Sequence, residues 1–132
     1  MQGKHLFEYS IIRYVPKVER GEAINLGIIM FCKELNFLKL KYKLDRERLL
    51  AFHCDADIEN LELHLRSFQL VSEGDETALG IASLEQTFRF RWLASKRSTI
   101  LQTSEIHPGF CKIRTKCLFI YLKNWWIVNA TN

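Results

Sequence analysis

The stretch Phe37–Leu44, "FLKLKYKL", alternates apolar and basic side chains without interruption after its first residue. One face carries Leu38, Leu40, Tyr42 and Leu44, and the other carries Lys39, Lys41 and Lys43. A period of two residues predicts a β-strand with one buried face and one solvated face. Lysines on the solvated face are typical of an exposed or edge strand, because they discourage pairing with another chain.

Two further strands are predicted upstream of this stretch. Residues Phe7–Val15 are rich in Tyr, Ile and Phe, which favour strands, and Pro16 ends the run because proline cannot donate a ladder hydrogen bond. Ala23–Phe31 is predicted to be the partner strand, and Glu34–Asn36 supplies a tight turn into the lysine-bearing strand. Residues 1–44 are therefore expected to form a three-stranded antiparallel meander.

The apolar period changes to helical spacing in the next part of the chain, residues 45–94. Asp45 is expected to cap a short helix that runs through Phe52, and Asp57 is expected to cap a longer one. Apolar side chains recur at helical spacing in the longer helix: Ile58, Leu61, Leu65 and Phe68. The acidic, glycine-containing segment Ser72–Leu79 is predicted to be a loop.

A third helix is predicted from a capping box at Ser83–Gln86, where the serine hydroxyl and the glutamine amide suit the free amide groups of a helix start. Leu84, Phe88 and Trp92 then form one apolar stripe that ends at Ala94. We expect this stripe to face the core.

A fourth strand is predicted at Thr99–Thr103, and His107-Pro108-Gly109 is expected to break it. The order of elements indicates an α+β fold: a small antiparallel sheet, made of the three-stranded meander plus this later strand, with helices packed on one face. Without repeats or linkers, residues 1–132 are expected to be a single domain, with 95–111 as the returning strand and turn and 112–132 as an atypical tail.

Length and composition suit a globular domain. The chain has 132 residues, of which 48% are hydrophobic and 26% are charged. No apolar run is long enough to cross a bilayer, and the sequence does not open with a signal segment. We therefore expect a cytoplasmic protein with no membrane partner.

The net charge of +4 is confined to the end of the chain. No acidic residue follows Glu105, whereas Lys112, Arg114, Lys116 and Lys123 are all basic, which leaves fifteen basic and fifteen acidic residues before them. The body of the protein is thus neutral. A nucleic-acid-binding protein usually carries clustered basic residues in excess, so nucleic acid is not an expected partner.

The sequence contains no recognisable metal or catalytic motif. The four cysteines and four histidines are scattered, without the paired short spacing of a zinc site. Ser98 has no base nearby in sequence, Asp55 and Asp57 suit helix capping, and no phosphate-cradling glycine loop is present. We expect no cofactor and no metal, and the absence of a catalytic pattern favours a protein that is not an enzyme.

One group of residues in the first hairpin suggests a ligand site. If Val15 faces Ala23 across the ladder, Arg13 faces Asn25 and Ile11 faces Gly27. A glycine within a strand often marks the close approach of a ligand or another backbone, and the arginine fork suits a carboxylate or phosphate. The alternative is structural: Arg13 pairs with Glu19 or Glu22, Asn25 ties down the loop, and Gly27 admits a closely packed helix.

Two runs resemble an uncharacterised bacterial family, domain of unknown function 3037. These are "YSIIRYVPKVERGEAINLGIIMF" and "FRFRWLASKRSTILQTSEIHPG", and the resemblance covers residues 7–111. The first signature comprises Arg13, Pro16, Arg20, Gly21, Asn25 and Gly27. The second comprises Arg91, Trp92, Arg97, Ser98 and His107-Pro108-Gly109. The resemblance implies no known activity, and it implies a possible partner, a kinase resembling HipA, the toxin of a toxin–antitoxin pair.

A shared pocket requires the two signatures to meet. If the fourth strand joins the sheet beside the first hairpin, Arg97 and His107 approach Arg13 and Asn25, and the group suits an anion. Arg91 lies off the predicted apolar stripe. Arg89-Phe90-Arg91 therefore either contributes to this pocket or forms a solvated helix face with one buried ring.

The tail, "KIRTKCLFIYLKNWWIVNATN", has no acid and contains two adjacent tryptophans. Translation in another frame permits an amphipathic helix that begins Asp-Pro, which resembles the family's ending. A one-base slip near Lys112 therefore remains one hypothesis, and a genuine terminal strand at Leu118–Tyr121, with Trp125 and Trp126 at a contact surface, remains the other. Sequencing the gene distinguishes them.

Two functions remain open from the sequence. The first is a non-enzymatic binding or accessory module, partnered with a HipA-like kinase. The second is an enzyme or sensor that binds a phosphorylated or nucleotide-like ligand in an arginine-lined pocket. The candidate contact residues are Arg13, Arg20, Asn25, Gly27, Arg91, Arg97, Ser98 and His107.

Overall fold

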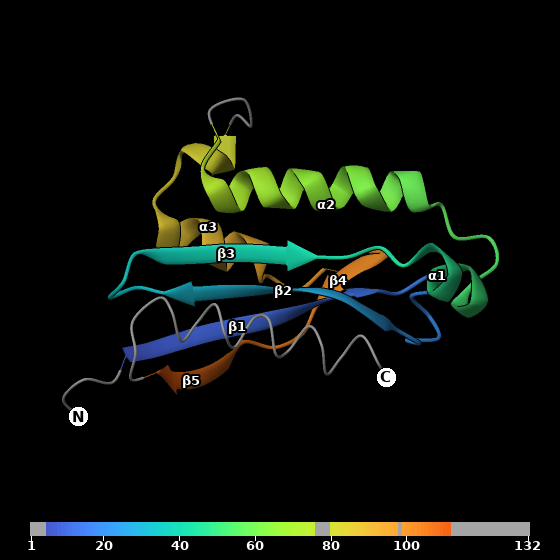
Figure 1. Cartoon of the computed structure of the whole chain (residues 1–132), viewed down its shortest axis with the longest axis horizontal. Helices are drawn as coiled ribbons and strands as arrows, with labels where there is room; N and C mark the ends of the chain where they lie inside the picture. Colours follow the sequence, from blue (N-terminus) through green and yellow to red (C-terminus); the bar gives the residue numbers. More distant parts are fainter. Residues whose placement is uncertain (1–4, 76–79, 98, 112–132) are drawn as a thin grey trace.

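The computed structural model describes residues 5–75, 80–97 and 99–111 (Figure 1). The strands are β1 His5–Tyr14, β2 Ile24–Cys32, β3 Phe37–Tyr42, β4 Leu101–Thr103 and β5 His107–Cys111. The α-helices are α1 Arg46–Phe52, α2 Ile58–Glu73 and α3 Gln86–Leu93, with a 3₁₀ turn, η1, at Gly80–Ser83. The predicted α+β architecture is confirmed. Ser98 and the tail 112–132, with both hypotheses for its origin, lie outside the described residues.

Strand β1 lies at the centre of the antiparallel sheet. On one side the order continues through β2 to β3, and on the other side β4 and β5 follow one another along the same edge of β1. Strand β1 pairs with β4 from Tyr14–Leu101 to Ile12–Thr103, and with β5 from Tyr9–His107 onward. Between these two stretches the returning chain has one residue more than β1. The returning chain therefore forms a longer edge than the predicted fourth strand.

Two buried serines hold the irregular step between β4 and β5. Ser104 Oγ accepts from the Ile11 amide at 2.8 Å, and the Ser104 amide donates to the Ile11 carbonyl at 2.8 Å. Ser10 Oγ donates to the Ser104 carbonyl at 2.7 Å. These bonds replace regular ladder pairing where the register shifts, so the buried backbone groups stay satisfied.

The prediction that His107-Pro108-Gly109 breaks the strand is wrong, because these residues open β5. Pro108 is tolerated because, among the described strands, β5 pairs with β1 alone, and an edge strand needs no amide on its outer side. Gly109 lies opposite Phe7, and a Cβ at this position would lie 2.8 Å from two atoms of the Phe7 ring. The glycine thus makes room for an aromatic ring that crosses the edge strand.

The helices cover one face of the sheet (Figure 1). The core on that side joins sheet residues such as Ile12 and Ile29 to Leu49, Leu65 and Phe90 from the three helices. The opposite face carries a second apolar cluster without any described helical residue: Phe7, Ile11, Ile28, Met30, Cys32 and Phe37. Helices on one face only, as predicted, are confirmed for the described residues.

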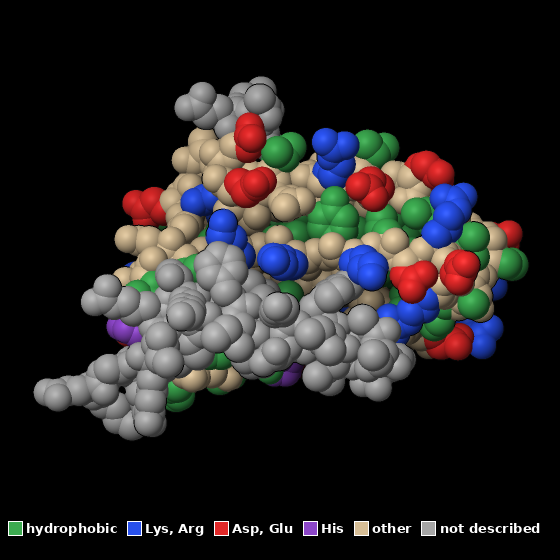
Figure 2. Space-filling model, viewed as in Figure 1, with side chains coloured by type: hydrophobic (Ala, Val, Ile, Leu, Met, Phe, Trp, Pro, Cys, Tyr) green, Lys and Arg blue, Asp and Glu red, His purple; other side chains and the backbone are tan. Residues whose placement is uncertain are grey.

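The alternation that predicted β3 is confirmed. Leu38 and Leu40 are buried in the helix-side core, whereas Lys39 and Lys41 are exposed. Figure 2 shows basic side chains in a row along β3. Among the described strands β3 pairs with β2 alone, so it is an edge strand, as the lysines predicted.

The first two helices begin where their caps predicted. Asp45 Oδ1 accepts from the Arg48 amide at 3.2 Å, and Asp57 Oδ1 accepts from the Asn60 amide at 3.1 Å. Helix α2 runs through Glu73 and ends at Gly74, whose φ of 68° suits a glycine cap. The loop predicted from Ser72 therefore begins too early, because the helix continues until a residue can adopt the left-handed conformation.

The predicted start and orientation of α3 are both wrong. Ser83 Oγ donates to the Gly80 carbonyl at 2.6 Å instead of capping the helix, and Gln86 Nε2 donates to the Asn36 carbonyl at 2.9 Å. The buried side chains of α3 are Phe90 and Leu93, with the Phe90 ring stacked on Phe31 at 4.9 Å. Apolar residues occupy both sides of this helix, so spacing alone could not choose the buried side.

The first hairpin contains a bulge that the predicted register lacked. Arg13 lies opposite Asn25 as predicted, but the register shifts between Ile12 and Arg13, and Gly27 lies opposite Ile12 rather than Ile11. A Cβ on Gly27 would overlap the Lys41 carbonyl and lie 2.9 Å from the Tyr42 Cα. The close approach at Gly27 is therefore made by the backbone of β3.

We expect Gly27→Ala to lower the free energy of unfolding by about 2 kcal/mol or more, because overpacking against backbone atoms cannot relax by side-chain rotation. Gly21→Ala is the control: it meets no atom within 4 Å, and its φ of 72° costs about 1 kcal/mol. Urea denaturation measures both variants. A smaller loss at Gly27 than at Gly21 contradicts the tight approach.

Candidate functional site

Arg13 and Asn25 meet on the face of the sheet that lacks helices. Each lies between two residues whose side chains enter the helix-side core, so both point to the opposite face. Arg13 Nε donates to Asn25 Oδ1 at 3.3 Å, and both side chains are half-buried. The two residues predicted to form a pocket floor are thus in contact, with part of their hydrogen-bonding capacity used on each other.

Arg97 lies on the helix side and is bound to the end of α3. Its Nη1 donates to the carbonyls of Leu93 at 2.9 Å and Ser95 at 3.1 Å, and its Nη2 donates to the Trp92 carbonyl at 2.7 Å. The last carbonyls of a helix have no intrahelical donor, so Arg97 supplies what the helix lacks.

Two aromatic rings enclose the same guanidinium. Its carbon atom lies 4.8 Å from the ring centre of Phe68 on α2 and 4.8 Å from that of Trp92 on α3. Burial lowers the pKa of Arg97, yet the group stays charged near neutrality because an arginine titrates far above it. Arg97 therefore joins α2 to α3 through stacking and caps α3 at the same time.

The remaining basic candidates are dispersed. His107 shares a face with Tyr9, with ring centres 5.2 Å apart. Four residues along a strand span about 13 Å, which separates His107 from Arg13 on that face. Arg91 is exposed on the helix side, 3.4 Å from Glu8. The predicted convergence of Arg97 and His107 with Arg13 and Asn25 does not occur: the sheet lies between Arg97 and the Arg13–Asn25 pair.

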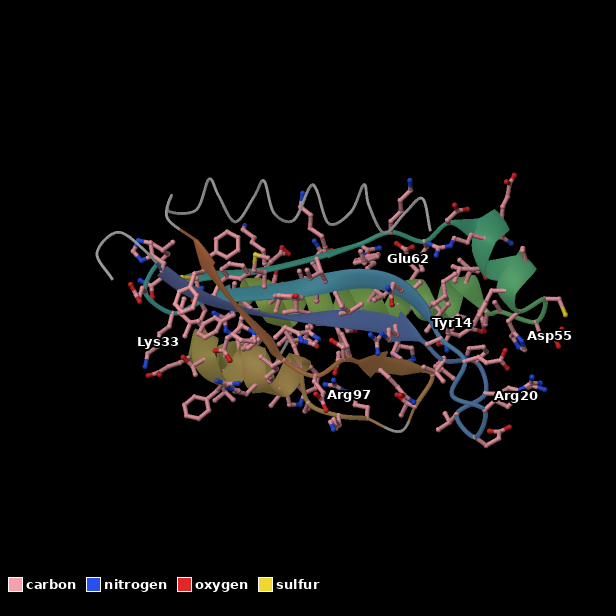
Figure 3. All side chains as sticks on the ribbon, turned by 90° about the horizontal axis from the view of Figure 1, so that it is seen from below. Tyr14, Arg20, Lys33, Asp55, Glu62 and Arg97 are labelled. Carbon is pink, nitrogen blue, oxygen red and sulfur yellow. The ribbon has the colours of Figure 1, made fainter. Side chains whose placement is uncertain are left out.

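Arg20 lies in the hairpin loop (Figure 3). It lines a separate hollow. Arg20 forms an ion pair with Glu22 at 2.7 Å, one of the two carboxylates that the structural alternative offered to Arg13. The hollow has a volume of about 350 Å³ and also contacts Lys17, His53 and Asp55. Its mixed charges do not select an anion. Among the described residues, no group of three or more His, Cys, Asp or Glu side chains could hold a metal ion.

Apolar side chains are exposed along α3, where the sequence predicted a buried stripe. Phe88 is 60% exposed and Trp92 37%, and we call these two residues the α3 stripe, while Leu84, 45% exposed, lies just before the helix. Arg91 lies three residues after Phe88, on the same side of the helix. Exposed large apolar side chains that gather on one face are typical of interaction sites. The sequence feature that could have indicated this surface is the presence of apolar residues on two sides of one short helix, since only one side can be buried.

A second exposed apolar pair lies on the same side of the sheet as α3. Leu6 is 45% exposed and Phe110 62%, and they pair across β1 and β5. Leu6 lies two residues before Glu8, which reaches Arg91 on α3, so both strand residues face the helix side. The helix side of the molecule therefore carries a second exposed apolar pair at the end of the sheet, with the Glu8–Arg91 ion pair between that strand and α3.

The fold and these surfaces define an α+β domain with exposed apolar side chains on its helix side. A family model described as "Protein of unknown function (DUF3037)" matches residues 9–119. The chain belongs to this family, as the two signatures predicted. The comparisons with curated proteins and with solved structures found no match. In the part of the chain that is described, no helix has the length and apolar character to span a membrane.

Replacing Arg97 by Gln should lower the free energy of unfolding by about 2 kcal/mol, because the helix end loses charge-assisted hydrogen bonds in a half-buried site. Arg97→Lys should restore little, since a lysine cannot reproduce the planar fork or the stacking. Arg91→Gln serves as the matched control and should cost less than about 1 kcal/mol, as an exposed ion pair does. Equal losses for Arg97→Gln and Arg91→Gln would contradict the capping role.

Tyr42 gives a pH-dependent test of the contact between β3 and α2. Burial raises the pKa of its phenol, and Glu62 raises it further by charge and hydrogen bonding, while Arg66 opposes the shift. The folded state disfavours the phenolate, so the free energy of unfolding should fall as the pH rises above about 10, where tyrosine ionises in the unfolded chain. Tyr42→Phe removes this ionisation. Between about pH 9 and 11, its free energy of unfolding, measured by thermal unfolding, should fall less steeply with pH than that of the wild type. An unchanged slope contradicts a buried phenol at this contact.

Proposed function

We propose that the protein is a cytoplasmic, non-enzymatic binding module that docks on another protein through the α3 stripe. One observation carries the proposal: Phe88 and Trp92, one turn apart on α3, present 60% and 37% of their surface to solvent. An aromatic pair on a helix offers large apolar area that a partner can bury.

Residues of the second family signature support this surface. Arg91 lies on the same side of α3 as Phe88 and is exposed, so it can act as a polar rim. Arg97 stacks on Trp92 and holds the carbonyls at the helix end, which fixes the orientation of the tryptophan ring. Three residues of this signature, Arg91, Trp92 and Arg97, thus lie at or beneath one exposed apolar surface.

The competing proposal of an enzyme or sensor with an arginine-lined pocket has less support. Arg13 lies on the face of the sheet without described helices, whereas Arg91 and Arg97 lie on the helix side, and both Nη atoms of Arg97 donate to backbone carbonyls. An anion at Arg97 would have to compete with these hydrogen bonds to the carbonyls at the end of α3. We do not carry this alternative further.

We propose a HipA-like kinase as the partner, on the strength of the family resemblance. Substitutions in the α3 stripe test this proposal, because they should weaken binding of such a kinase. Binding can be measured between a purified HipA-like kinase and this purified chain.

Phe88→Glu should weaken binding of the HipA-like kinase encoded by the same organism by at least tenfold, because a charge replaces an apolar contact. Isothermal calorimetry measures the affinity, and denaturation of the variant should show a change of less than about 0.5 kcal/mol, as at other exposed positions.

Leu63→Glu is the matched control, since Leu63 is 65% exposed on α2. It should leave the affinity unchanged. If Phe88→Glu and Leu63→Glu bind equally well, the α3 stripe is not the docking surface. If the wild-type protein does not bind the kinase, this choice of partner is wrong.

A further inference from the structure

The edge of the sheet at β3 is a second surface, separate from the α3 stripe. Strand β3 pairs with β2 on one side, and no described strand lies on its other side. The outer side of an edge strand presents backbone amides and carbonyls in register, which is a template for another extended segment.

A groove runs between this edge and α2. Its volume is about 540 Å³, and four consecutive residues of β3, Lys39–Tyr42, form one wall. Gln69, Ser72 and Glu73 of α2 form the other wall. In Figure 2 a green apolar strip lies between the basic row along β3 and the acidic side chains over α2. The groove thus has a strand edge on one side and a helix on the other.

The two sides of β3 offer different chemistry to an added strand. Lys39 and Lys41 are exposed and alternate with Leu38 and Leu40, which enter the helix-side core. Within the described part of the chain, none of the ion pairs involves Lys39 or Lys41. These lysines are available to a carboxylate opposite them, whereas the half-buried Tyr42 offers apolar contact on the α2 side.

We propose that an extended acidic segment of another protein adds to the outer edge of β3 as a further strand. The cross-strand rule specifies its sequence: acidic side chains opposite Lys39 and Lys41, alternating with apolar side chains that enter the groove beside α2. Backbone hydrogen bonds supply affinity, and the alternation supplies selectivity.

Charge argues against a second copy of this chain as the occupant. Pairing two β3 strands would bring lysine rows against each other, and like charges that face one another across a ladder are destabilising. The same lysines favour a partner of opposite charge. An acidic extended segment therefore suits the edge, and self-association does not.

The probe is an acetylated peptide, Glu-Val-Glu-Val-Glu-Val-Glu amide, titrated by calorimetry into the full chain. The double variant Lys39→Glu, Lys41→Glu should weaken binding about tenfold, because two attractive pairs become repulsive. The double variant Lys17→Glu, Lys96→Glu changes the net charge equally, at two exposed lysines outside the groove, and should bind as the wild type does. Equal weakening by both double variants overturns the proposal in favour of a net-charge effect.

Two N-methylated peptides test the strand pairing itself. Successive residues of a strand direct their amides to opposite sides, so methylation of one central residue faces β3 and methylation of the next faces solvent. We expect about a tenfold loss for one of the two peptides and little change for the other. Equal affinities for both, or no binding of the parent peptide, overturn the proposal and leave the lysines as protection against edge pairing alone.

Phe88→Glu separates this inference from the proposed docking through α3. It should leave the peptide affinity unchanged, because the α3 stripe does not line the groove beside β3. Peptide binding lost in Phe88→Glu contradicts two independent surfaces. If the wild-type protein binds the peptide but not the kinase, the kinase is rejected as the partner and the β3 edge is kept as a binding surface.

Discussion

Strand β1 is the element on which the other strands depend, because it pairs along both edges. The hairpin supplies its partner β2, and the returning chain supplies β4 and β5 on the other edge. Ser10 and Ser104 satisfy the backbone where that edge changes register. Without this serine contact, the buried polar groups at the step would lack partners, and the two halves of the edge could not follow one strand.

Arg97 stabilises the fold and also supports an exposed surface residue, Trp92. Its guanidinium satisfies carbonyls at the end of α3 and stacks on Phe68 and Trp92. A lone buried charge is costly, but here hydrogen bonds and aromatic faces surround it. The arginine therefore fixes the position of a tryptophan that remains partly exposed.

Local patterns predicted most of the fold, and non-local contacts account for the errors. Alternation identified β3, and the Asp45 and Asp57 caps identified two helix starts. The buried side of α3 could not be chosen, because stacking of Phe90 on Phe31 joins residues far apart in the chain. The candidate site was predicted less well: Arg13 does meet Asn25, but the role of Arg97 depends on Phe68 of another helix, which spacing does not reveal.

The Ser10–Ser104 contact spans 94 residues of sequence. Contacts between distant residues close large loops, so their formation is slow compared with a local hairpin. During synthesis, β1 and β2 can pair early, whereas the second edge of β1 stays open until the chain has been made as far as β5. This interval exposes an apolar central strand to other nascent chains, and rapid completion of the last strands protects the protein from misassembly.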